Sequence, residues 1–594
     1  MKKTGKYEAP RGSSVRKLTV VCVVLACLLA VSVPVGIRLL GSRADPGVTV
    51  PSTVTMQPET QATTEAPTEP VPQETVDPTL HWEWGYVAAE GTAAEFYDAY
   101  GTPAGMIPRG TQLKYEQGSD GRTWILAGDI IGYLEAGAGI VPDISETVME
   151  QTLYVRTSVN LRDGEGKLLE AFGQKGAAVL VTGCDYLLEN GVAHMYRVLC
   201  GEQEGYIMPW YLAETEEAAL ANYDGGSYAT HAGRGNRYGG GGAADLDYFP
   251  REKGPIDGNP MPEECRTLYL TTWSLGNIDA YLKIANESGI NAFVVDIVDG
   301  GSVGYASDVM KAYCPSAAAA AKNAVEDYRA AIQKLKDAGY YVIGRITTFN
   351  DIYFVQDHPE CAITRPNGDP LRLNATYWPT PYNRYAWQYK VDLAVEAVEL
   401  MGFHEIQFDY VRFPDKTRTY ENAGTIDFHN TYGESKAQAI QRFLMYATDI
   451  LHEHGAYVSA DVFGESAYTY VTAYGQYWPA ISNVVDVISG MPYPDHFGAS
   501  GSWRPWEHPY ETLYTWGQNV MNRQRETATP AAVRTWIQAY NAIREPYNVY
   551  GPNQVFAQIK ALRDAGCTGG YMTWNSGASL EKYRQLMPAF TPPD

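Results

Sequence analysis

The chain has 594 residues, which is too long for one ordinary core, so two to four domains are expected. Asp plus Glu (69) exceed Lys plus Arg (46), and the formal net charge of -23 opposes general binding to nucleic acid or to anionic lipid surfaces. Tyr (44) and Trp (13) are abundant, and such side chains either fill cores or stack on the apolar faces of sugar rings.

The N-terminal segment predicts a membrane anchor. Residues 1–17 form a basic tail, and an uncharged apolar run begins at Leu18 and ends at Ile37. As a helix, its roughly 20 residues span about 30 Å, the thickness of the hydrocarbon layer. We assign a transmembrane helix to residues 18–40, with the N-terminus in the cytoplasm and the C-terminal domains outside the cell. A cleaved signal peptide is the alternative, although no clear A-x-A cleavage site follows.

The next three segments predict a spacer and two small domains. Residues 41–80 are rich in Pro, Thr and Glu, and such a composition buries too little apolar surface to order the chain. Short β-like runs separated by Gly-rich turns then fill residues 81–147, and a second set fills residues 152–213. The two sets end on similar phrases, IGYL from residue 131 and GYI from residue 205, which indicates a tandem repeat.

The second β-rich set resembles the bacterial SH3 domain (SH3b) found beside cell-wall enzymes. The resemblance rests on VRTSVNLRDGEG, on the KG before a strand, and on GYI leading into WYL. It implies a short-stranded barrel that holds the protein in the cell wall, and residues 81–147 are then a divergent copy. Its aromatic side chains can either bind a ligand or fill a small core.

Cysteine usage does not define a site. Of the 8 cysteines, Cys22 and Cys27 lie in the apolar run, and no C-x-x-C pair or zinc spacing occurs among the others. We therefore predict no metal site and no cofactor. Cys184 and Cys200 lie in strand-like runs on either side of ENG, where a cross-strand disulfide and two separate buried thiols are both open.

A Gly-rich linker is predicted at residues 214–264, and the pattern changes after it. Over residues 265–594 apolar strand-like runs alternate with amphipathic helical stretches, which is typical of a parallel α/β fold. Eight strands are expected, beginning at residues 266, 291, 340, 405, 456, 484, 533 and 568. The predicted fold is an α/β (β/α)8 TIM barrel. An open doubly wound sheet is the alternative, though no G-x-G-x-x-G follows the first strand.

The expected strand ends are unusually polar, and in a TIM barrel the active site lies at the C-terminal ends of the strands. Asp409 ends strand four and Asp461 ends strand five, so two neighbouring strands aim carboxylates at one place. A glycosidase needs such a pair. We assign Asp409 as nucleophile, or as base if the enzyme inverts, and Asp461 as general acid/base, with Glu465 as second choice. Adjacent strand ends favour the short carboxylate separation of retaining enzymes.

Other strand-end residues are assigned to substrate binding, namely Asp296, Arg345, Arg412, Tyr493, Asp495, Tyr540 and Trp574. Arg345 and Arg412 can hold Asp409 in its charged form. Trp574, Tyr493 and Trp273 can stack on sugar or simply pack. The alternative for the charged residues is a buried salt-bridge network of Asp296, Arg345, Asp409 and Arg412 that fills the barrel.

The barrel region resembles a family of (β/α)8 barrels from Gram-positive bacteria that are assigned as glycoside hydrolases from sequence and are distantly similar to α-amylase barrels. The phrases that carry the resemblance are FDYVRFP (408–414), SADVFG (459–464), ISGMPYPDHF (488–497) and YMTWNSG (571–577). It implies a strand-four nucleophile, which matches Asp409. The sequence departs from the wider group at Gln407, where that group places an Arg, and in lacking a clear Glu at the end of strand five.

Together these features predict a membrane-anchored extracellular glycoside hydrolase that cleaves a cell-wall or environmental polysaccharide. Its predicted partners are a polysaccharide or peptidoglycan glycan, the cell wall through the SH3-like domains, and the membrane through the N-terminal helix. The alternative is a catalytically inactive barrel that binds glycan at the wall. A peptidoglycan amidase or peptidase is disfavoured because the chain has no H-E-x-x-H.

Overall fold

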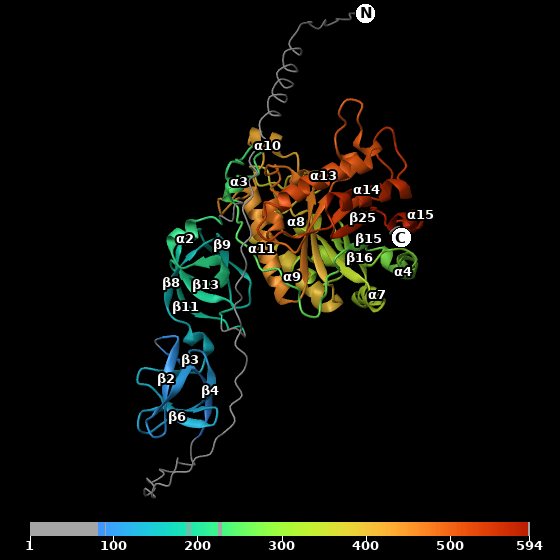
Figure 1. Ribbon diagram of the computed structural model, residues 1–594. Helices are drawn as coiled ribbons and strands as arrows, with labels where there is room; N and C mark the ends of the chain where they lie inside the picture. Colours follow the sequence, from blue (N-terminus) through green and yellow to red (C-terminus); the bar gives the residue numbers. More distant parts are fainter. Residues whose placement is uncertain (1–80, 90, 187, 189–191, 224–227, 592–594) are drawn as a thin grey trace, which may run out of the picture. The chain divides into compact units, whose positions relative to one another are not determined.

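The computed structural model describes residues 81–89, 91–186, 188, 192–223 and 228–591 (Figure 1). The predicted transmembrane helix at 18–40, the basic tail before it and the spacer after it lie outside the described residues. Within the described ranges, no helix combines the length and the apolar character needed to cross a membrane.

Two seven-stranded antiparallel sheets precede the C-terminal region. The first contains β1 (Glu83–Ala88), β2 (Ala93–Asp98), β3 (Pro103–Pro108), β4 (Gln112–Gln117), β5 (Thr123–Ala127), β6 (Ile130–Leu134) and β7 (Gly139–Val141). The second contains β8 (Gln151–Val155), β9 (Val159–Arg162), β10 (Leu168–Gly173), β11 (Ala178–Cys184), β12 (Tyr196–Cys200), β13 (Gln203–Ile207) and β14 (Leu212–Ala213). The strands of the first sheet lie in the order β3-β2-β6-β5-β4-β1-β7, and those of the second in the order β10-β9-β13-β12-β11-β8-β14. The two sheets therefore have the same topology. The resemblance to SH3b domains stays a prediction.

The possible disulfide in the second sheet does not form. Cys184 and Cys200 are free thiols. In the β11–β12 ladder Cys184 lies opposite Tyr196, whereas Leu199, the neighbour of Cys200, lies opposite Leu180. The two thiols therefore lie at opposite ends of the ladder, too far apart for a disulfide.

Parallel strands form a nearly closed barrel in the C-terminal region, consistent with the predicted TIM barrel. They are β15 (Cys265–Leu270), β16 (Ala292–Asp299), β19 (Tyr341–Thr347), β20 (Glu405–Asp409), β21 (Tyr457–Phe463), β22 (Val487–Met491), β23 (Ala532–Val533), β24 (Thr535–Gln538) and β25 (Gly570–Trp574). The ladder returns on itself because β15 pairs with both β16 and β25. The seventh position is split at Arg534, where β23 pairs with β22 and β24 pairs with β25.

Helices surround these strands (Figure 1). The longer ones are α4 (Ile278–Asn286), α7 (Val325–Asp337), α9 (Arg384–Met401), α11 (Lys436–Glu453), α13 (Pro509–Gln524), α14 (Pro552–Ala565) and α15 (Leu580–Phe590). Short elements in the connections are β17 (Ser302–Tyr305), α5 (Asp308–Tyr313), α6 (Pro315–Ala319), β18 (Ala321–Asn323), α8 (Ile352–Asp357), α10 (Arg418–Ala423) and α12 (Trp478–Ser482). In α7 the spacing of Tyr328, Ile332 and Leu335 places all three on one buried face. Helix α9 stops at Gly402, whose φ of 70° suits the left-handed helix cap.

The described part of the predicted linker packs against the barrel. It includes α2 (Glu216–Leu220) and α3 (Tyr228–Ala232). Arg234 forms an ion pair with Glu526 at 2.8 Å, and Nζ of Lys253 donates to two backbone carbonyls at 2.6 Å each. Burial lowers the pKa of Lys253 to about 7. The described part of the predicted linker is therefore held against the barrel by these contacts.

Strand β20 brings polar side chains into the barrel. Glu405, Gln407 and Asp409 alternate with Ile406 and Phe408, and a strand turns alternate residues to opposite faces. Phe408 packs edge-on against Phe443 of α11, with ring centroids 5.2 Å apart. The barrel interior at this strand is consequently polar at three levels, from Glu405 at the N-terminal end to Asp409 at the C-terminal end.

Candidate active site

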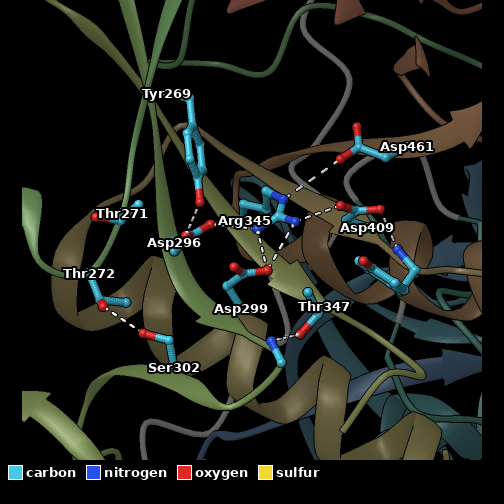
Figure 2. Close-up of polar contacts among 12 residues, drawn as sticks. Tyr269, Thr271, Thr272, Asp296, Asp299, Ser302, Arg345, Thr347, Asp409 and Asp461 are labelled. Atoms are coloured by element: carbon cyan, nitrogen blue, oxygen red, sulfur yellow. Dashed lines mark hydrogen bonds and ion pairs between the residues drawn. The ribbon is translucent and has the colours of Figure 1, made fainter. Parts of the chain in front are cut away.

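One buried guanidinium collects carboxylates from three other strands at the C-terminal end of the barrel (Figure 2). Arg345 lies near the end of β19, between β16 and β20. Its Nη1 lies 2.6 Å from Oδ1 of Asp296, and its Nη2 lies 2.6 Å from Oδ2 of Asp409. Oδ1 of Asp299 lies 3.2 Å from Nη1, and Oδ2 of Asp461 lies 4.0 Å from Nε. These five residues are called the Arg345 cluster below.

Asp409 is held at both oxygens. Besides its contact with Arg345, it accepts a hydrogen bond of 2.5 Å at Oδ1 from the backbone N–H of Tyr410. Acceptance at both oxygens is the pattern of a carboxylate anion. Tyr410 has a φ of 50°, in the left-handed region, so the strand ends sharply at Asp409. The strand that was expected to begin at residue 405 therefore ends at Asp409.

Asp461 is placed beside Asp409 but deeper in the barrel. Its Oδ1 accepts a hydrogen bond of 2.8 Å from Nε1 of Trp536, and its Oδ2 has no hydrogen-bond partner among the described residues. Burial and then the negative charge of Asp409 raise the pKa of Asp461 well above its usual range, against the opposing effect of Arg345. Asp461 is thus suited to keep a proton. Its side chain is only 1% exposed, however, so in this conformation it is covered.

Asp296 forms the other buried side of the cluster. It accepts a hydrogen bond of 2.5 Å from the hydroxyl of Tyr269 and contacts Arg345. Burial raises the pKa of Asp296 to about 7, although Arg345 lowers it in part. Tyr269 also packs against Trp574 at 4.8 Å, and the Arg345 guanidinium lies 5.5 Å from the Trp574 ring centroid. Trp574 therefore borders the cluster.

Arg412 does not take part in the cluster. Its Nη1 donates to the backbone carbonyl of Phe413 at 3.1 Å and lies 3.5 Å from Asp415. Its guanidinium stacks over Phe463 at 4.3 Å. No hydrogen bond or ion pair joins Arg412 to Asp409 among the described residues, because the chain turns at Tyr410. The charge of Asp409 still acts on Arg412, so the expected support of Asp409 by Arg412 stays a prediction. Of the predicted salt-bridge network, the structure contains the contacts among Asp296, Arg345 and Asp409 only.

Three further predicted binding residues lie together, and one of them, Tyr493, lies close enough to Asp461, Asp409 and Arg345 for their charges to act on it. Asp495 is fully buried and accepts hydrogen bonds from the Tyr540 hydroxyl at 2.9 Å and from Nε2 of Gln538 at 3.2 Å. Tyr493 packs edge-on against Tyr540, with centroids 6.2 Å apart. Asp495 therefore positions Tyr540. Trp273, by contrast, is exposed.

Glu465 is engaged by two tyrosines. Its oxygens accept hydrogen bonds from the hydroxyls of Tyr470 at 3.1 Å and Tyr474 at 2.9 Å, and neither partner belongs to the Arg345 cluster. We expect Glu465→Gln to change kcat/KM by less than about threefold, because the amide keeps one acceptor and loses about 1 kcal/mol of local hydrogen bonding. Steady-state kinetics on any substrate found for the protein measures this. A loss of about 10²-fold or more is the size expected of a general acid and would return that role to Glu465.

Sequence reasoning missed Tyr269 and Trp536, which support the two buried acids. Both lie in expected strands, and both occupy alternate positions that face the barrel interior. An aromatic residue with a polar tip at such a position is a signal that could have found them. Within the described residues, no group of three or more His, Cys, Asp and Glu could hold a metal ion.

The protein has a parallel α/β barrel, and acidic side chains gather at the C-terminal ends of its strands. This is the face at which TIM-barrel proteins carry their active sites. The chain belongs to the family described as "Putative glycosyl hydrolase domain", whose profile matches residues 267–580. All the residues of the Arg345 cluster lie within this match. Among curated protein sequences, none matches the chain.

Solved structures are similar to parts of the chain. A hypothetical protein from Ruminiclostridium thermocellum is 36% identical, covers 33% of this chain and 97% of its own, and has a TM-score of 0.28. The PgaB (BpsB) glycoside hydrolase domain from Bordetella bronchiseptica is 14% identical, with coverage of 55% and 99% and a TM-score of 0.40. The spore cortex-lytic enzyme SleL from Bacillus cereus is 10% identical, with coverage of 55% and 75% and a TM-score of 0.33.

Proposed function

We propose that the protein is a glycoside hydrolase that cleaves a glycan by a two-carboxylate mechanism with Asp409 as nucleophile. The observation that carries the proposal is the Arg345 cluster, in which carboxylates from three strands converge on one guanidinium at the C-terminal end of the barrel. Asp409 accepts hydrogen bonds at both oxygens, from the backbone of Tyr410 and from Arg345, and the other three carboxylates lie beside the same guanidinium. Carboxyl groups that converge on one place can supply the acid and nucleophile roles of a glycosidase. Family membership supports the same reaction class.

The finer parts of the proposal rest on the sequence. Asp409 and Asp299 contact one guanidinium, so their carboxyl groups lie close together. A short distance between the two carboxyl groups supports a mechanism that retains the anomeric configuration. Anchoring by residues 18–40, with the barrel outside the cell, rests on the apolar run and its basic flank. A cell-wall or environmental polysaccharide as substrate follows from that location and from the SH3b resemblance.

A second candidate function is glycan binding without turnover. It is favoured by the burial of Asp296 and Asp461, each 1% exposed at the side chain, because a salt-bridge network can fill a barrel interior without acting on a sugar. Both functions are compatible with a glycan partner, so only turnover separates them.

Turnover by the purified full-length protein tests the proposal. The protein is incubated with wall glycans and with α- and β-linked polysaccharides, and new reducing ends are measured beside binding to the same glycans. We expect release of reducing ends by the wild-type protein. Binding with no release from any glycan that the protein binds would support the second candidate instead.

The raised pKa of Asp461 predicts how stability depends on pH. A proton held more tightly in the folded state stabilises the fold at low pH, and that contribution is lost as the pH rises from about 4 through the folded-state pKa. The amide introduced by Asp461→Asn never ionises and can still accept the hydrogen bond from Trp536. The free energy of unfolding of Asp461→Asn should therefore increase relative to that of the wild type as the pH rises from about 5 to 9.

Chemical denaturation at a series of pH values measures this difference. Asp308→Asn is the control, because the Asp308 side chain is 86% exposed. Its difference from the wild type should stay nearly flat over the same range. A difference for Asp461→Asn that is also flat, or that shrinks with rising pH, means that Asp461 is ionised in the folded protein throughout.

A further inference from the structure

Side-chain exposure separates the four carboxylates of the Arg345 cluster. Asp296 and Asp461 are 1% exposed, Asp409 is 9% exposed and Asp299 is 40% exposed. A catalytic acid must come within about 2.6–3.2 Å of the atom that takes its proton. In this conformation the carboxylates that a substrate can reach are therefore Asp409 and Asp299.

Asp299 and Asp409 both contact the terminal nitrogen atoms of the Arg345 guanidinium. Nη2 of Arg345 lies 2.6 Å from Asp409 and 3.3 Å from Oδ1 of Asp299, so the two acids share one nitrogen atom from strands on either side of β19. In Figure 2 dashed lines join Arg345 to only one oxygen of Asp299. Among the contacts of the described residues, Oδ2 of Asp299 accepts no hydrogen bond. It is therefore available to a ligand.

The chain beside Asp299 is not crowded by side chains. Asp299 is the last residue of β16, and Gly300 and Gly301 follow it. A Cβ atom built on either glycine would have no other atom within 4 Å. Gly300 has a φ of 54° and donates its N–H to Oγ1 of Thr347 at 2.9 Å, which fixes the turn. Open space thus adjoins the exposed carboxylate.

Two buried atoms without hydrogen-bond partners among the described residues point to a different role for Asp461. They are its own Oδ2 and Nε of Arg345, which lie 4.0 Å apart behind the guanidinium. Unpaired polar atoms in a buried site are costly unless they serve the site. The contact of Asp461 with Arg345, which itself contacts Asp409, fits a positioning role better than direct contact with a substrate.

We propose that Asp299 is the general acid/base of the reaction and that Asp409 is its nucleophile. This inference rests on the proposed function and replaces Asp461 as the group that touches the leaving oxygen. In the first step an oxygen of Asp409 bonds to the anomeric carbon, the glycosidic C–O bond breaks, and its electron pair takes the proton of Asp299. In the second step Asp299 takes a proton from water, the water oxygen bonds to the anomeric carbon, and the bond to Asp409 breaks with its electron pair returning to that carboxylate.

Substrates with different leaving groups test the assignment. The full-length wild-type protein and its Asp299→Ala, Asp461→Ala and Asp308→Ala variants are assayed on 2,4-dinitrophenyl and phenyl glycosides of glucose, galactose and N-acetylglucosamine in both anomeric forms. Dinitrophenolate is a good leaving group without protonation, whereas the phenyl glycoside needs a proton from the general acid before phenol can leave. We expect Asp299→Ala to lose about 10²–10⁴-fold on the phenyl glycoside and far less in the dinitrophenyl-releasing step. Azide should restore turnover and give a glycosyl azide with the configuration of the substrate.

The other variants make the result specific. Asp461→Ala should slow both substrates by a similar factor without rescue by azide, as a positioning role requires, and Asp308→Ala should match the wild type. Turnover by Asp299→Ala equal to that of the wild type, or an equal loss on both leaving groups without azide rescue, would overturn the assignment while leaving the proposed function intact. No turnover of any substrate by the wild-type protein, in this assay and with polysaccharides, would contradict both.

Discussion

Replacing Asp409 with Asn is expected to lower kcat/KM by at least about 10⁴-fold, because the amide cannot form the bond to the anomeric carbon that starts the reaction. The amide keeps nearly the same shape and can still accept the hydrogen bond from Tyr410. The fold should therefore survive, and the loss should appear in kcat rather than in glycan binding. Steady-state kinetics beside isothermal titration with the same glycan separates these two quantities.

Asp308→Asn is the matched control for this experiment, since it removes an exposed carboxylate from α5, shortly after β16 in the chain. It should leave kcat/KM unchanged. Turnover by Asp409→Asn at the wild-type rate would remove Asp409 from the mechanism and, with it, the role we give to the Arg345 cluster.

Replacing Arg345 with Met is expected to reduce the free energy of unfolding at pH 8 by about 3–5 kcal/mol and to abolish turnover. The guanidinium is 1% exposed, and its removal leaves its carboxylate neighbours facing one another without a counter-charge. The folded-state pKa values of Asp296 and Asp461, which Arg345 lowers in part, then rise further, so the variant loses stability as the pH rises. Its deficit relative to the wild type should shrink as the pH falls toward 5. Chemical denaturation at several pH values measures both effects.

Arg534→Met provides a comparison at the opposite end of the barrel. Arg534 is equally buried and pairs with Glu405 at 2.8 Å, so its loss should also destabilise the fold. The folded fraction of Arg534→Met should nevertheless keep its turnover per molecule, because Glu405 lies at the N-terminal end of β20, away from Asp409. Wild-type stability of Arg345→Met at pH 8 would contradict the charge arrangement described for the cluster.

The barrel could be predicted because its strands are short apolar runs between amphipathic helices. This pattern is local, so it can be recognised in the sequence without knowledge of tertiary contacts. The interior direction of Asp409 followed from the same alternation in β20. The split of the seventh strand at Arg534 could not be predicted, because it depends on pairing of β23 and β24 with different neighbours. The predicted transmembrane helix stays a prediction from the sequence.

The choice between Arg345 and Arg412 as the partner of Asp409 also lay beyond the sequence. Both arginines follow the strand pattern, but the left-handed φ of Tyr410 ends β20 and carries Arg412 onto the aromatic ring of Phe463. The burial of Asp461 could not be predicted from the sequence either. Alternation places Asp461 on the interior face, whereas its burial depends on Trp536, which is 75 residues away in the chain.

Trapping of the glycosyl intermediate tests the central claim most directly. The full-length protein is treated with the 2-deoxy-2-fluoro dinitrophenyl analogue of whichever glycoside it turns over, and the labelled peptide is identified by mass spectrometry. The account predicts one label per chain, on Asp409. A label on Asp299 or Asp461, or turnover to a product of inverted configuration with no label, would contradict it.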